Sequence, residues 1–113
     1  MLKKINRLTN QKDFDKVYKN GKSSFDKIIG VKAVNNNRNN TRIGVVVSSK
    51  INKKAVVRNK IKRQIRSVIE KNSEKLKLGK DIVIIALPPI IEVEFSIIKI
   101  SIAKHFKKLN LSN

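Results

Sequence analysis

The sequence predicts an α/β sandwich of the α+β type, a two-layer arrangement in which helices pack on a small mixed sheet. Three observations support this fold class. Two long segments repeat apolar residues at helical spacing, several short segments are rich in Val and Ile, and turn-forming residues separate them. The chain has 113 residues, so we expect one domain over residues 1–113. The predicted order is helix, strands, helix, strand, helix.

The first predicted element is a short helix. Thr9 or Asn10 can cap its first turn, and the helical pattern continues to Lys19. Gly21 is expected to end it in the left-handed conformation that glycine adopts readily. Three larger side chains recur at helical spacing and therefore share one side of this helix: Phe14, Val17 and Tyr18.

Two strands follow the first helix. Residues 27–34 and 42–48 are rich in Val and Ile, which favour strands. Ile43, Val45 and Val47 alternate along the second strand and so lie on one of its faces. Residues 35–40 are polar and rich in Asn, and they predict a hairpin between the two strands.

A long helix is predicted next, from about Lys53 or Ala55 to about Leu76. Its apolar residues recur three and four positions apart and form one stripe: Val57, Ile61, Ile65, Val68 and Ile69. Such a stripe is typical of a helix that packs on a sheet, with its other sides left to solvent.

A buried strand and a last helix complete the expected fold. Residues 81–87 are almost all aliphatic, which predicts a strand buried on both faces. The segment 42–87 therefore predicts a parallel strand–helix–strand crossover, for which a right-handed connection is the default. Residues 93–109 carry a second apolar stripe with helical spacing: Phe95, Ile98, Ile102, Phe106 and Leu109.

The charge of the chain is strongly basic and unevenly distributed. Lys and Arg number 27 against 8 Asp and Glu, which gives a net charge of +19. Residues 27–69 contain no acid, and eight of the seventeen residues from Lys50 to Arg66 are basic. This segment has no acids of its own to balance its cations, so the pattern favours a polyanionic partner.

The basic residues of the long helix lie on sides that the apolar stripe leaves free. Arg58, Lys62 and Arg66 form one row four residues apart, and Asn59, Lys60 and Arg63 flank it. Guanidinium groups bind phosphate with two parallel hydrogen bonds, and Asn can bind base edges or 2′-hydroxyls. A solvated cationic face is the ordinary alternative. We favour a nucleic-acid surface because like charges at this spacing repel each other and no Glu lies among them.

Other classes of protein fit the sequence less well. Without cysteine there is no disulfide, thiol nucleophile or Cys-based metal site. No signal-peptide pattern or apolar run of membrane-spanning length occurs, so we expect a cytoplasmic protein that does not insert into a membrane. The acids are scattered, and we expect no metal site in the protein. His105, the only histidine, is expected to be a helix-face residue rather than a catalyst.

Several motifs in order along the chain resemble the bacterial ribonuclease P protein subunit family. Residues 55–66, A-V-V-R-N-K-I-K-R-Q-I-R, are similar to its R-N-x-x-K-R signature helix. The resemblance covers essentially the whole chain. Its other parts are residues 2–8 with Asp13-Phe14 and Val17-Tyr18, then 21–23, Arg42-Ile43-Gly44-Val45 with Val47-Ser48, and the strand 81–86.

This resemblance implies a fold and a function. The family fold is an α/β sandwich with a left-handed crossover around the basic helix. Members are the small partners of a catalytic RNA that removes the 5′ leader from precursor tRNA, with Mg²⁺ ions bound chiefly by the RNA. We therefore expect two RNA partners, the catalytic RNA and the precursor tRNA with its leader, and neither DNA nor a membrane. The chain would be an enzyme only as a subunit, with no catalytic residue of its own.

The resemblance also assigns roles to residues of this chain. The catalytic RNA would bind the basic helix and the turn before it: Lys53, Lys54, Arg58, Asn59, Lys60, Lys62, Arg63 and Arg66. The leader would contact Phe14 and Tyr18 by stacking, and Lys32 through its phosphates. Core packing is an equally good reading of Phe14. Lys32 stands where the family often has an aromatic residue.

The turn before the basic helix departs from the family pattern. Asn52 stands in place of a glycine, with one further residue inserted, and Asn tolerates a left-handed turn. Two other binding functions remain open. A ribosomal-type RNA-binding protein shares the small basic α/β character, although it does not require Phe14 and Tyr18 together with the signature helix. A membrane-surface protein is disfavoured because the apolar stripe is needed for the core.

Overall fold

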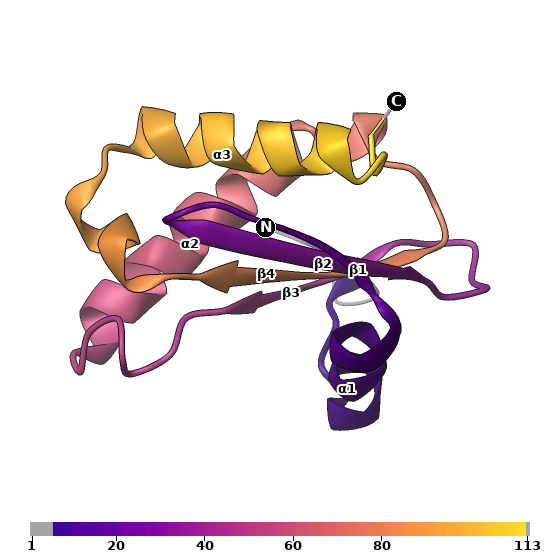
Figure 1. Ribbon diagram of the computed structural model, residues 1–113, viewed down its shortest axis with the longest axis horizontal. Helices are drawn as coiled ribbons and strands as arrows, with labels where there is room; N and C mark the ends of the chain where they lie inside the picture. The colour runs from indigo at the N-terminus through magenta and orange to yellow at the C-terminus, as the bar shows by residue number, and fades with distance from the viewer. Residues whose placement is uncertain (1–5, 113) are drawn as a thin grey trace.

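The computed structural model describes residues 6–112, which fold around one mixed sheet (Figure 1). Its helices are α1 (Gln11–Asn20), α2 (Ala55–Lys71) and α3 (Phe95–Lys108), with short 3-10 helices η2 (Ser73–Lys75) and η3 (Pro88–Glu92). Its strands are β1 (Lys22–Phe25), β2 (Ile29–Asn35), β3 (Arg42–Val46) and β4 (Lys80–Ala86). The first part of the N-terminal motif, residues 2–5, lies outside the described residues.

The strand order of the sheet is β1-β2-β4-β3. Strands β1 and β2 pair antiparallel, as do β2 and β4, whereas β3 and β4 are parallel. The predicted parallel crossover is thus confirmed. The predicted hairpin through residues 35–40 is wrong, because β4 lies between β2 and β3. Strand β4 is buried along most of its length, and a central position in the sheet allows both of its faces to be covered.

Strand β1 is not predicted by the sequence analysis. Its residues are mostly polar, and it forms through pairing with β2 and through the turn at Asp26. The Asp26 carboxylate accepts hydrogen bonds from the backbone N–H groups of Ile28 (2.8 Å) and Ile29 (2.9 Å). A side chain that satisfies nearby backbone donors in this way stabilises a tight turn.

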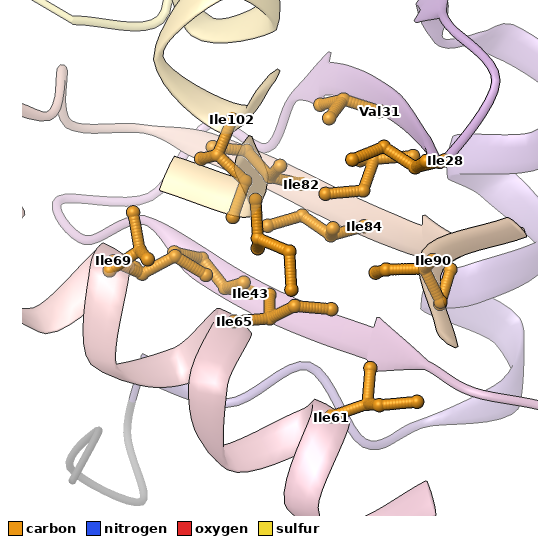
Figure 2. Close-up of a cluster of buried hydrophobic side chains, with 14 of the residues drawn as sticks. Ile28, Val31, Ile43, Ile61, Ile65, Ile69, Ile82, Ile84, Ile90 and Ile102 are labelled. Atoms are coloured by element: carbon orange, nitrogen blue, oxygen red, sulfur yellow. The ribbon is translucent and has the colours of Figure 1, made fainter. Parts of the chain in front are cut away.

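Helices cover both faces of the sheet (Figure 1). The larger core lies between the sheet and helices α2 and α3, and it is built mostly from isoleucine (Figure 2). It includes the predicted stripes of α2 and α3, with Val57, Phe95 and Leu109 at its margin. A smaller cluster on the other face joins α1 to the sheet through Leu8, Val17 and Val83. The predicted sandwich is therefore confirmed, with α1 as an additional layer.

The two ends of α1 differ in how well they were predicted. Asn10 caps the helix as expected, because its side chain accepts the N–H of Lys12 at 2.9 Å. Gly21 is not left-handed, since its φ is −74°. Glycine is needed there for space: a Cβ would lie 2.5 Å from the Val17 carbonyl oxygen and 3.0 Å from that of Ala33.

Helix α2 is shorter than predicted. It ends at Lys71 rather than near Leu76, and η2 follows. The side-chain amide of Asn72 donates to the carbonyl oxygen of Val68 at 2.8 Å, and its backbone N–H bonds Ile69 at 3.2 Å. Asn competes with the helical backbone for hydrogen bonds in this way, which explains the early end.

Candidate nucleic-acid interface

Helix α2 presents its cations on a fixed support. Ile61, Ile65 and Ile69 are buried against the sheet, as Figure 2 shows, and they hold the helix in place. Asn59, Lys60 and Arg63 are exposed, and Arg58, Lys62 and Arg66 are partly exposed. Glu70 is the only acid in the helix. The six predicted RNA-binding residues of α2 therefore lie together on the outer sides of the helix.

The loop before α2 is ordered by one of the predicted RNA-binding residues. The Arg58 guanidinium donates from Nη1 to the carbonyl oxygens of Asn52 (2.9 Å) and Lys53 (2.8 Å). The Asn52 side chain accepts the backbone N–H of Lys54 at 2.8 Å. Lys53 and Lys54 are exposed on this loop, which places them beside the first turn of α2. Arg58 thus has a structural task besides its charge.

The left-handed turn expected at Asn52 is not formed. Among the described residues other than glycine, positive φ angles occur at Asn37 and Asn110. Asn52 keeps the turn by its side-chain hydrogen bond to the Lys54 N–H instead. The loop therefore reaches a compact shape without the glycine of the family pattern.

The second predicted set lies on the opposite face of the sheet, beside α1. The rings of Phe14 and Tyr18 have centroids 6.4 Å apart and are tilted by 33°. Lys32 Nζ lies 5.9 Å from the centre of the Tyr18 ring, within range of a cation–π contact. The three residues therefore form one group. It is separate from the cations of α2, because α1 and α2 cover different faces.

Phe14 and Tyr18 differ in exposure. The Phe14 ring packs over Gly44, where a Cβ would lie 2.5 Å from Cζ of the ring, and it borders the smaller core. Tyr18 is 39% exposed. Partial burial, and then the nearby charge of Asp15, raise the pKa of Tyr18, so its hydroxyl stays protonated and neutral at pH 7. Tyr18 is the ring of the two that is more available to a ligand.

The only histidine lies in a buried polar network between α3 and the β1–β2 turn. His105 is 1% exposed, with Nε2 3.0 Å from the Asp26 carboxylate and Nδ1 2.7 Å from Ser24 Oγ. A carboxylate only accepts hydrogen bonds, so Nε2 donates to Asp26. Ser101 donates to the same carboxylate at 2.6 Å. Ser24 and His105 are too buried to meet a substrate, so we interpret this network as structural.

We expect replacement of Asp26 by asparagine to lower the free energy of unfolding by about 1–3 kcal/mol at neutral pH. Burial raises the pKa of Asp26, but hydrogen bonds from Ser101 and from the backbone of Ile29 and Ile28, and the nearby His105, together lower it below its usual value. The stabilisation is therefore present above the unfolded pKa near 4 and is lost as pH falls through the lower folded pKa.

Urea unfolding at pH 7, 4 and 3 would measure this effect. The difference between the wild-type chain and Asp26→Asn should shrink below pH 4. A difference that stayed constant with pH would show that the Asp26 charge does not contribute.

Two kinds of feature are absent from the described residues. Within residues 6–112, no cluster of three or more His, Asp or Glu side chains is placed to hold a metal ion. In the same part of the chain, no helix has the length and apolarity needed to cross a bilayer. A small α+β fold with a cationic helix on one face and half-exposed aromatic rings on the other is typical of an RNA-binding protein.

Comparisons with known proteins define the family. The family model described as Ribonuclease P matches residues 2–110. The ribonuclease P protein component of Alkaliphilus oremlandii is 37% identical over 112 residues, which is 99% of this chain and 97% of that protein. The corresponding protein of Bacillus pumilus is 39% identical over 108 residues, 95% of this chain and 90% of that protein. The chain belongs to the ribonuclease P protein family.

Solved structures agree with this assignment. The Staphylococcus aureus RNase P protein matches with a TM-score of 0.88 at 33% identity, over 96% of this chain and 98% of that one. The Thermotoga maritima RNase P protein matches with a TM-score of 0.78 at 31% identity, over 87% and 92%. Superposition preserves the hand of connections, so the crossover around α2 has the hand of this family. The right-handed default is replaced by the left-handed crossover that the resemblance implies.

Proposed function

We propose that this chain is the protein subunit of a ribonuclease P and binds the catalytic RNA through α2 and the loop before it. Lys60, Lys62, Arg63 and Arg66 would bind phosphates, and Asn59 would bind a base edge or a 2′-hydroxyl. Lys53 and Lys54 would add contacts from the loop that Arg58 orders. The single observation that carries this proposal is the rigid, acid-poor cationic surface of α2.

The opposite face of the sheet would bind the leader of precursor tRNA. An unpaired leader exposes base faces, and each is worth about 1–3 kcal/mol when stacked on an aromatic ring. Tyr18 and the exposed edge of Phe14 would supply such surfaces, and Lys32 would bind a nearby phosphate. This arrangement lets one small protein hold the catalytic RNA and the substrate at the same time.

In this proposal the polypeptide positions RNA and breaks no bond. The acids of the described residues do not fit a Mg²⁺ site, and the buried His105 cannot reach a phosphodiester. Mg²⁺ held by the RNA would supply the charge stabilisation and activated water for hydrolysis. The protein would contribute cations that offset phosphate repulsion between leader and catalytic RNA. Its place of action is the cytoplasm, where bacterial precursor tRNA is made.

Reconstitution tests this function directly. The purified chain is mixed with a bacterial ribonuclease P RNA at low Mg²⁺, and a precursor tRNA is followed on a denaturing gel. We expect leader removal that neither component gives alone under these conditions. Cleavage by the chain without RNA, or no stimulation at any Mg²⁺ concentration, would contradict the proposal.

We expect Tyr18→Ala to weaken binding of precursor tRNA to the holoenzyme by about fivefold to tenfold. Affinity for mature tRNA should not change, because the ring would contact only the leader. The measurement is the ratio of the two dissociation constants for wild type and variant. Tyr18→Phe serves as the matched control, since it keeps the ring and should keep the ratio. Equal losses on both tRNAs would contradict a leader contact.

A further inference from the structure

A third aromatic residue, Phe25, lies on the same face of the sheet as Phe14 and Tyr18. Phe25 ends β1 and pairs with Gly30 of β2. The alternate residues Ile29, Val31 and Ala33 face the larger core, so Gly30 and Lys32 face the other way, toward the α1 side. The Phe25 ring covers the position where a Gly30 side chain would stand.

Gly30 makes this position of the ring possible. A Cβ at Gly30 would lie 2.1 Å from Cε2 of Phe25 and 2.4 Å from Cδ2, which no side chain could occupy. The φ angle of Gly30 is not positive, so the backbone itself does not require glycine. The absent side chain is therefore needed for the ring, which rests against the sheet and remains 49% exposed.

The ring continues into a half-buried apolar row that crosses all four strands. In the sheet register Phe25 pairs with Gly30, Gly30 with Ile85, and Ile85 with Val46. Ile85 and Val46 are partly exposed although both border the smaller core. Helix α1 sits beyond this row, where its Phe14 covers Gly44. The row is thus a shallow apolar floor beside the Tyr18 and Lys32 group.

The distribution of aromatic residues adds to this argument. The chain has four Phe, one Tyr and no Trp. Phe106 is buried in the larger core and Phe95 packs at its margin, so the other three rings all lie on one face of the sheet. Nucleic-acid bases stack on aromatic rings that have one face against the protein and the other in solvent.

Charge around the floor favours a polyanion rather than a protein. Lys27 is exposed just beyond the Phe25 strand end, and Lys32 is two residues from Gly30, about 7 Å along β2. Lys22 pairs with Ala33 and therefore faces the α3 side instead. The neighbouring carboxylate of Asp26 is turned to the α3 face, where it binds Ser101 and His105. The Asp26 carboxylate is therefore not directed toward the apolar floor.

We propose that Phe25 is an additional base-stacking position for single-stranded RNA, in line with Tyr18 and separated from it by Lys32. The inference rests on the proposed function, since it identifies the strand as the leader of precursor tRNA. One leader base stacks on Tyr18, the phosphate beside it meets Lys32, and a base further along the strand stacks on Phe25. Phe25 then determines how many leader nucleotides the protein holds.

The test combines protein variants with leaders that each lack one base at one position. Affinity for the holoenzyme is measured for wild type, Phe25→Ala and Tyr18→Ala. We expect Phe25→Ala to weaken binding of the intact leader by about fivefold. One abasic position should abolish the Phe25 effect, and a different abasic position should abolish the Tyr18 effect. Phe25→Trp should bind as tightly as wild type or more tightly.

Controls separate the ways in which this inference can fail. Ile100→Ala removes an exposed apolar side chain from α3, on the other face, and should leave leader affinity unchanged. If Tyr18→Ala weakens leader binding and Phe25→Ala does not, the inference is overturned and the proposed function stands. If neither variant has an effect, leader binding by this face is overturned as well. Phe25→Ala could instead lower affinity equally for mature tRNA or for the catalytic RNA alone, or change the oligomeric state in sedimentation. Any of these outcomes would contradict a leader contact and assign Phe25 another partner.

Discussion

Replacing Asp81 by alanine is expected to lower the free energy of unfolding by about 3–5 kcal/mol. Asp81 is 1% exposed at the start of β4. Its carboxylate accepts hydrogen bonds from Arg42 Nε (2.9 Å) and Nη2 (2.7 Å) and from the Asn36 side chain (2.8 Å). The variant leaves the Arg42 guanidinium, whose side chain is only 13% exposed, with Asp13 at 3.1 Å as its remaining carboxylate. A loss of this size is a large part of the 5–15 kcal/mol typical of a domain.

The position of Arg42 explains why the effect should be large. Arg42 and Asp81 are direct partners at the start of the parallel pair β3–β4, and Asp13 ties the same guanidinium to α1. Hydrogen bonding to Asp81, which outweighs the effect of burial, raises the pKa of Arg42 in the wild-type chain. A guanidinium stays protonated in proteins even without such a partner, so in the variant the cation cannot escape by losing its proton. In a chain of net charge +19, removing the main carboxylate partner of a buried cation also adds to repulsion across the molecule.

Urea unfolding of Asp81→Ala and of Asp15→Ala would measure this contribution. Both variants remove one negative charge, but Asp15 is exposed on α1 and bonds only the nearby Gln11 side chain in the contacts described. We expect Asp15→Ala to change stability by less than about 0.5 kcal/mol. Similar losses in the two variants would mean that net charge, not the buried pair, determines the result.

Periodicity was sufficient to predict the elements that form the larger core. The stripes of α2 and α3 and the aliphatic run of β4 lie where the pattern places them, because each pattern reports burial of the element's own residues. Periodicity could not predict which strands pair with each other. The Asn-rich residues 35–40 suit a hairpin locally, yet β4 competes for both neighbouring strands and takes the central place. A local turn pattern carries no information about such a competitor.

The candidate site also has a part that could be predicted from the sequence and a part that could not. The cations of α2 could be predicted because the acid-free segment and the apolar stripe are both visible in the sequence. The position of Phe25 could not, because it depends on the register that sets its ring over Gly30. The task of Arg58 was also hidden, since it bonds carbonyl groups of a loop whose shape follows from folding. For Phe25, the one signal available in the sequence was the short spacing between this aromatic residue and Gly30 in K-S-S-F-D-K-I-I-G.

Motif residues that look functional in the sequence can have structural tasks. Asp13, Arg42 and Asp81 belong to three separate motifs of the family resemblance, and the structure joins them in one ion-pair network. Charged residues at the starts of strands, such as Arg42 and Asp81, would ordinarily suggest contacts at the protein surface. Their burial here shows that part of the resemblance reflects how α1, β3 and β4 are held together.

The triple variant Lys62→Gln, Arg63→Gln and Arg66→Gln is expected to weaken binding of the catalytic RNA by about 100-fold at moderate salt. Each cation that contacts a phosphate releases a counterion, so the slope of log affinity against log salt should fall by about three. Glutamine is a good helix former, and the buried stripe of α2 is unchanged, so the fold should persist. Filter binding over a salt series gives both quantities.

A second triple variant separates a phosphate-binding surface from general attraction by a basic protein. Lys104→Gln, Lys107→Gln and Lys108→Gln remove the same charge from exposed positions on α3. Long-range attraction depends on total charge and falls with salt, so this control should lose only a few-fold and mainly at low salt. Direct contacts on α2 should cost much more than equal charge elsewhere, because they are made at fixed positions. Equal losses from the two helices would show that net charge alone drives RNA binding and that α2 has no special part in it.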